Sequence, residues 1–165
     1  MRLRAMAGIV VSVTGLFAGQ LSAQQEPIER FIIEQLSCVE APRVLPILLI
    51  LESLGKIKAD ERIGYDSVSC FRIHGGIRVN GITFQSICGF EDSEAIRNLR
   101  PDLLWRGPGT SPSRFISFGT PVDFKIAQKW YFQNIGRRYL NQAIRTDDTS
   151  MGDNTEIRCS NFFRY

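Results

Sequence analysis

The chain has 165 residues, with 20 lysines and arginines against 17 aspartates and glutamates. It begins like a secretory signal peptide, with a positive start at Arg2 and Arg4, an apolar run over 5–17 and a small-residue exit ending in Ala23. Cleavage there leaves 18 basic against 17 acidic residues in 24–165. A nearly neutral mature chain has no basic footprint for phosphate backbones, so we expect no nucleic-acid partner.

An uncleaved membrane anchor is the rival interpretation of residues 1–23. Leu21 is larger than the usual residue three before a cleavage site. The apolar run, however, is interrupted by Gly8 and Gly15 and is shorter than the roughly 20 apolar residues of a spanning helix. We therefore expect a signal peptide over 1–23, no membrane span after cleavage, and a secreted, periplasmic or extracellular, single globular domain over 24–165.

The mature chain contains four cysteines, Cys38, Cys70, Cys88 and Cys159. An even number in an oxidising compartment predicts two disulfides, with three pairings open. Metal binding is the competing use of cysteine, but the chain has no Cys-x-x-Cys pair and one histidine. We expect no metal ion or other cofactor.

Two helices are predicted before the first strand. Residues 27–36 have apolar residues at helical intervals, with Pro27 suited to a first turn. Residues 44–54 are apolar around nearly the whole circumference and end at Gly55, a natural C-terminal cap. A helix of about 11 residues is too short to cross a bilayer, so we expect it in the core; burial against a partner is the alternative.

A change to two-residue periodicity at Tyr65 predicts strands. Gly75-Gly76 permits a turn or bulge, and Asn80-Gly81 between apolar runs is a strong hairpin signal. The returning strand, 82–90, directs Cys88 to the same face as its apolar residues, so we expect Cys88 in the core.

Further elements follow Phe90. Residues 91–99 predict a short helix capped by Ser93, and a glycine- and proline-rich loop over 107–113 precedes a strand over 114–118. Thr120, followed by Pro121, predicts the capped start of an amphipathic helix near 121–135.

The aromatic run 130–132 should leave one of its three residues exposed on that helix, because consecutive helical residues are about 100° apart. Two strands over 138–144 and 155–163 complete the chain. The expected fold is α+β, with the N-terminal helices packed on a mostly antiparallel sheet, stapled by disulfides.

Catalytic chemistry has little support. A strand places His74 about 13 Å from Cys70, too far for proton transfer, so His74 is expected to be a surface histidine. The carboxylate clusters at 91–94 and 147–153 are typical of solvated acids, although a hydrolase with two acids and a weak calcium site at 147–153 are alternatives. We assign no catalytic residue.

Three residues are candidates for recognition: Trp105 and Arg106, which precede the glycine-rich loop, and Trp130 in the later helix. The alternative is that Trp105 fills core space with Arg106 in solvent, and that the aromatic run 130–132 packs beneath the terminal strands. The first hypothesis is an exported, non-catalytic domain that binds a protein partner, as an inhibitor, immunity-type or accessory factor does. The alternatives are a small-molecule carrier, with a cavity between the 121–135 helix and the sheet, and a hydrolase that uses loop carboxylates.

Overall fold

The computed structural model describes residues 18–107, 114–147 and 149–160, and for residues 18–26 it describes the backbone alone. The helices are α1 (Ala18–Leu36), α2 (Val44–Ser53), a 3-10 turn (Ala59–Glu61), α3 (Glu94–Arg97), α4 (Phe124–Asn134) and α5 (Leu140–Ala143). The strands are β1 (Ile63–Tyr65), β2 (Val68–Val79), β3 (Ile82–Phe90), β4 (Phe115–Thr120), β5 (Ile144–Arg145) and β6 (Thr155–Ser160).

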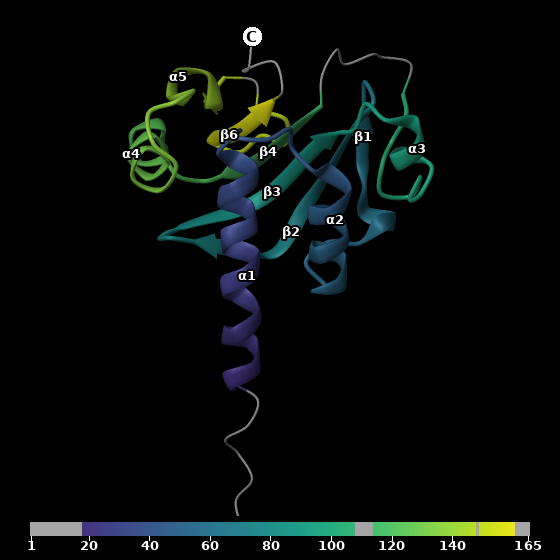
Figure 1. The fold of residues 1–165 in the computed structure, drawn as a ribbon, viewed down its shortest axis with the longest axis horizontal. Coiled ribbons are helices and arrows are strands. Elements are labelled where there is room, and N and C mark those ends of the chain that lie inside the picture. The colour runs from purple at the N-terminus through teal and green to yellow at the C-terminus, as the bar shows by residue number, and fades with distance from the viewer. Residues whose placement is uncertain (1–17, 108–113, 148, 161–165) are drawn as a thin grey trace, which may run out of the picture.

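The fold is α+β, as predicted. All strand pairs are antiparallel, in the order β1-β2-β3-β4-β6-β5. Helices α1 and α2 cross one face of the sheet, and α4 and α5 lie near its β5 end, opposite β1 and α3 (Figure 1). The sheet thus has two well-separated ends, each with its own side-chain environment.

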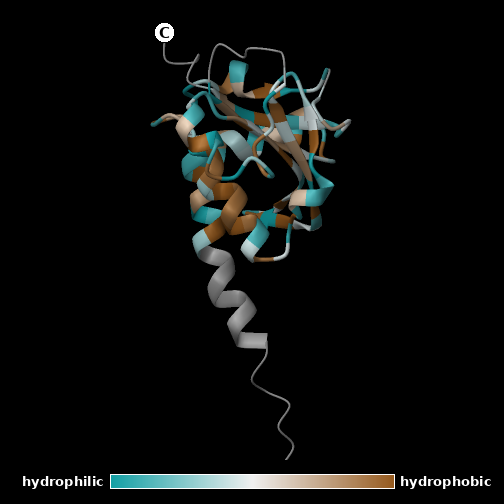
Figure 2. Cartoon of the chain, turned by 90° about the vertical axis from the view of Figure 1, so that its right-hand side faces the viewer, coloured by the Kyte–Doolittle hydropathy of each residue, from teal (hydrophilic) through white to brown (hydrophobic). Residues whose placement is uncertain are grey.

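The predicted N-terminal helices are both present. Helix α1 is already helical at Ala18, the first described residue, so it includes the expected cleavage position after Ala23 and places Pro27 inside a helix. Its first turns project beyond the sheet (Figure 1). Helix α2 is largely apolar (Figure 2) and buries five residues, in agreement with the expected core helix: Val44, Leu45, Ile47, Leu48 and Leu51. The chain leaves it through Gly55, which has φ +65°.

Two tight turns fix the register of the first three strands. Asn80 and Gly81 both have positive φ and join β2 to β3, as predicted. Asp66 and Ser67, also at positive φ, join β1 to β2. The pairing of β2 with β3 shifts between Arg72 and Ile77, which confirms the irregularity expected at Gly75-Gly76.

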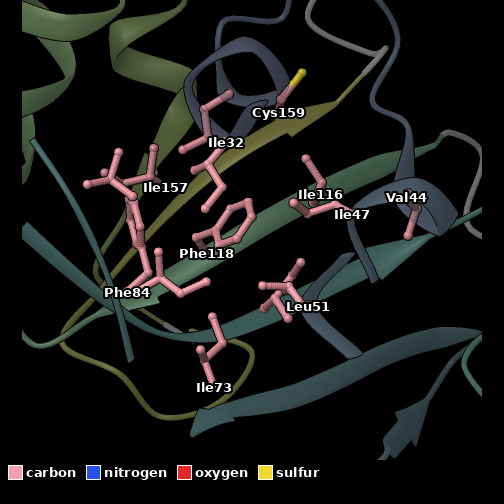
Figure 3. Close-up of a cluster of buried hydrophobic side chains, with 14 of the residues drawn as sticks. Ile32, Val44, Ile47, Leu51, Ile73, Phe84, Ile116, Phe118, Ile157 and Cys159 are labelled. Carbon is pink, nitrogen blue, oxygen red and sulfur yellow. The ribbon is translucent and has the colours of Figure 1, made fainter. Parts of the chain in front are cut away.

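The main core lies between the helices and the inner face of the sheet. Apolar side chains from α1 and α2 interdigitate there with those of β2, β3, β4 and β6 (Figure 3). Helix α4 adds Ala127, Trp130 and Tyr131 to the same cluster. The Cys38–Cys159 disulfide joins the end of α1 to β6 across 121 residues. This bridge ties the first helix to a strand from the other end of the chain.

The second disulfide, Cys70–Cys88, joins directly paired residues of β2 and β3. Both predicted bridges are thus formed, and the described part of the chain has no free cysteine. Cys88 is buried as expected, but it packs on the outer face in a smaller cluster with Val68, Cys70 and Phe90. The pairing shift between β2 and β3 accounts for the difference, since it changes which β3 residues face the helices: Phe84 and Ile87 both join the main core.

Two predictions near the C-terminus were wrong in detail. Thr120 does not cap α4: it is fully buried as the last residue of β4, and its hydroxyl donates to the carbonyl of Thr83 at 2.8 Å. Asp123 is the cap, because its carboxylate accepts from the Ile126 N–H at 2.9 Å.

The strand expected over 138–144 is mostly absent. Tyr139 has a left-handed backbone, with φ 63°, and the chain then turns through α5 before the two residues of β5. The following strand is confirmed over Thr155–Ser160, while the remainder of its predicted range and the loop 108–113 lie outside the described residues. No described helix combines the length and the apolar run that a bilayer span requires.

Candidate functional site

The acidic cluster at the end of β3 is tied into ion pairs. One guanidinium nitrogen of Arg114 lies 2.8 Å from Glu91 and 2.7 Å from Asp92. Glu91 is almost fully buried, and this burial raises the pKa of its carboxyl group. The Arg114 guanidinium helps to lower the pKa of Asp92 against the opposing effect of desolvation. These two carboxylates hold a loop in place.

In the second acidic cluster, Asp153 is also tied into an ion pair. Asp153, with a side chain 5% exposed, pairs with Arg72 at 2.9 Å and accepts a short hydrogen bond from the Ser86 hydroxyl. Ser86 lies in β3 and Glu91 directly follows that strand, five residues along the chain, so about 16 Å separates these two positions. Asp153 and Glu91 are therefore too far apart to act as a glycosidase-type pair, whose carboxylates lie at most about 9.5 Å from each other. Glu91 and Asp92 do lie close together, but both are paired with Arg114.

His74 lies on the surface of β2, as expected. Its Nε2 is 2.6 Å from Glu61, and its side chain is 45% exposed. Cys70, the nucleophile considered for it on that strand, forms a disulfide with Cys88. Within the described ranges, no group of three or more metal-ligating side chains gathers, and Asp148 of the suggested calcium loop lies outside them.

Large apolar and cationic side chains instead gather at the β1 end of the sheet. We call this surface the edge patch and define it by Arg62, Ile63, Tyr65, Trp105 and Arg106. Ile63 is 50% exposed, Tyr65 40% and Trp105 38%. Because β1 is the terminal strand in the described sheet order, the patch lies along an edge of the sheet.

The Trp105 side chain packs closely against the backbone of β1 at this edge. A Cβ at Gly64 would lie 2.7 Å from Cγ of the indole, so the ring packs directly on the β1 backbone. The backbone N–H of Trp105 donates to the Ser69 hydroxyl at 2.6 Å, and the Arg62 guanidinium lies 5.4 Å from the centroid of the indole ring. The indole is therefore positioned by β1 and β2, although its own segment is a loop.

The remaining side chains of the patch surround Trp105. Ile63 and Tyr65 pair with Cys70 and Val68, so they share the outer face of the sheet, while Gly64 and the indole lie toward the other face. Arg106 forms an exposed ion pair with Glu94 at 3.1 Å. The patch thus wraps around the strand edge, with apolar groups on both sides and arginines at its margin.

Trp130, the third predicted recognition residue, lies in the core. Its ring is 4% exposed, contacts Phe84 edge-to-face at 5.5 Å, and donates from Nε1 to the Val79 carbonyl at 2.9 Å. A small-molecule carrier would need a cavity between α4 and the sheet. That space is filled here by the buried side chains of Trp130 and Tyr131. Phe132 is the exposed member of the aromatic run, at 45%, as the helical spacing predicted.

Phe132 lies in an open hollow of about 370 Å³ on the outer side of α4, which we call the α4 groove. It is lined by Lys125, Gln128, Lys129, Phe132, Arg137 and Leu140. The Arg137 guanidinium lies 5.1 Å from the Phe132 ring centroid. The sequence signal for this surface is the distribution of charge, since residues 124–145 contain five basic residues and no acidic one.

No protein-family model, curated protein or solved structure matches this chain. Its functional assignment therefore rests on the geometry of its own side chains.

Proposed function

We propose that this chain is an exported, non-catalytic protein-binding domain, of the inhibitor, immunity-type or accessory kind, and that the edge patch contacts its partner. The observation that carries the proposal is the gathering of Ile63, Tyr65 and Trp105, each at least 38% exposed, on one edge of the described sheet. Tryptophan, tyrosine and arginine are the residue types that contribute most to protein interfaces.

The rigidity of the patch supports the same proposal. Ile63 is paired with Cys70, which is cross-linked to Cys88 on the next strand. Arg62 is fixed by hydrogen bonds from its guanidinium to the carbonyls of Pro101 and Asp102, at 2.7 and 2.5 Å. An interface whose anchors are already ordered loses little conformational entropy when the partner binds.

Export is supported by the signal-peptide pattern at the N-terminus and by the two disulfides. Disulfides form and persist in oxidising compartments such as the periplasm or the extracellular space. A binding role also agrees with the ion pairs that engage Glu91 and Asp92 with Arg114, and Asp153 with Arg72.

The test is native mass spectrometry of the tagged protein recovered from the cells that produce it, together with surface variants. We expect a stoichiometric protein companion with the wild type, and loss of most of that companion with Ile63→Lys. Val39→Lys is the matched control, since Val39 is 70% exposed and lies outside the patch.

Gly64→Ala adds a second variant, because its methyl group displaces the Trp105 ring without changing any charge. We expect it to weaken the companion's binding as well. A wild-type protein that is recovered alone, or a companion that is retained equally by Ile63→Lys and Val39→Lys, would contradict the proposal.

A further inference from the structure

The α4 groove differs from the rest of the molecule in its charge. Residues 124–145 hold five of the 18 basic residues of the mature chain and none of its 17 acids. The other residues of 24–165 therefore carry 13 basic and 17 acidic groups. The segment 124–145 thus carries a net positive charge and the other residues of 24–165 a net negative one, and three of its five basic residues, Lys125, Lys129 and Arg137, line the groove.

The cations of the groove stand outside the ion pairs that the described residues form. Among the described residues, no carboxylate pairs with Lys125, Lys129 or Arg137, whereas Arg72, Arg100 and Arg114 each have one. All three groove cations are exposed. The three positive charges around one hollow repel one another, and a bound anionic group would reduce this repulsion.

The groove also offers apolar surface between its cations. On α4, Lys125, Lys129 and Phe132 fall within about 60° of one another around the helix axis. The hollow continues from them to Leu140 across the turn at Gly136. A ligand for this surface therefore combines negative charge with an apolar group that covers Phe132.

We propose that the α4 groove binds a short acidic segment of another protein, with its carboxylates on the three groove cations and an apolar side chain against Phe132. The site lies at the opposite end of the sheet from the edge patch and is independent of it (Figure 1). A domain with both surfaces contacts its partner, or two partners, at two places.

The observations favour a short segment over an extended polyanion. A nucleic acid or an anionic membrane presents phosphates over a wide area, and the acidic background of the other residues repels such a surface. Membrane insertion is further disfavoured because the exposed Phe124 and Ile126 point about 200° apart around the helix. They do not form a single face that enters a bilayer.

The test measures binding of a fluorescent peptide of alternating glutamate and leucine to the full mature protein. The same peptide with glutamine in place of glutamate is the ligand control. We expect binding of the glutamate peptide that weakens at least tenfold in the double variant Lys125→Glu/Lys129→Glu and that falls with added salt. Arg78→Glu, at an exposed cation of β2 outside the groove, should keep wild-type affinity.

Amide chemical shifts then locate the peptide. We expect shifts at Lys125, Lys129, Phe132 and Arg137. Equal binding of the glutamine peptide, equal weakening by Arg78→Glu, or binding of phosphatidylglycerol vesicles without binding of the glutamate peptide would each overturn the proposal. Because none of these results concerns Ile63 or Trp105, they leave the test of the edge patch unaffected.

Discussion

The carboxylate of Asp153 and the guanidinium of Arg72, 81 positions apart in the sequence, form an ion pair 2.9 Å long on the outer face of the sheet. Arg72 also donates a short hydrogen bond to the carbonyl of Met151, whose side chain packs on the Cys70–Cys88 cluster. This pair fastens the polar loop before β6 to β2. The loop therefore covers part of the sheet's outer face.

Removal of that carboxylate should release the loop. We expect Asp153→Ala to cost about 1–3 kcal/mol of unfolding free energy, because Arg72 and the Ser86 hydroxyl lose a charged partner. Hydrogen exchange at Ser150, whose N–H donates to Glu156 at 2.8 Å, should accelerate. Asp147→Ala, at an exposed carboxylate of the same loop, is the control and should stay within about 0.5 kcal/mol of wild type.

The two disulfides should differ in their contribution to stability. Cys38–Cys159 closes a separation of 121 residues and Cys70–Cys88 one of 18. Chain entropy then predicts a loss of about 5 kcal/mol when the first pair is replaced by serine, and about 3 kcal/mol for the second. Urea unfolding of the two double variants measures the difference. An equal or larger loss from the Cys70–Cys88 pair would show that chain entropy does not control their ranking.

The cap of α4 gives a test of the corrected helix start. Asp123→Ala should cost about 1 kcal/mol, since the Ile126 N–H loses its acceptor. Asp123→Asn keeps an acceptor oxygen and should cost less than half as much. Thermal unfolding of both variants measures the effect, and equal stability of all three proteins would place the cap elsewhere.

Local signals in the sequence account for much of the fold. Asn80-Gly81 specifies a hairpin because both residues tolerate positive φ, and Ser93 caps α3 by accepting from Ile96 as predicted. The apolar run over 44–54 predicts a buried helix because apolar side chains cover nearly its whole circumference. These features depend on neighbours within a few residues.

The errors arise where tertiary pairing decides the outcome. Thr120 has the chemistry of a cap, but the hydrogen bonds between β4 and β6 continue through it to Thr155. The segment over 138–144 lacks a long strand because β5 pairs with β6 through two residues only. Neither competition is visible in a local pattern.

The candidate surfaces were predicted in part. Trp105 and Arg106 were identified by residue type, but Ile63 and Tyr65 become significant only because β1 ends the sheet. Trp130 and Phe132 are two residues apart on one helix, and the packing of α4 determines that the first is buried and the second exposed. A local sequence pattern does not specify the order of the strands or the orientation of a helix, and these two features decide which residues are exposed on each surface.

The buried hydroxyl of Tyr131 predicts a pH dependence. Burial raises the pKa of this phenol to about 12, above the value of about 10 in the unfolded chain. Its contribution to stability is therefore complete below pH 10 and is lost as the pH rises toward 12, by about 2–3 kcal/mol. Urea unfolding from pH 9 to 11.5 should show this slope in wild type and in Tyr65→Phe. Tyr131→Phe should remove it; an unchanged slope would exclude Tyr131 as its source.

The edge patch is the central claim, and site-specific photo-crosslinking in the producing cells tests it most directly. A photo-reactive amino acid replaces Tyr65 in one variant and Leu49 in another; both positions are about 40% exposed, but Leu49 lies on α2. We predict one defined crosslinked protein species from position 65 and none of that species from position 49. The same crosslink from both positions, or its absence from position 65 while the wild-type chain is found in a complex, would contradict the assignment of the edge patch as the binding surface.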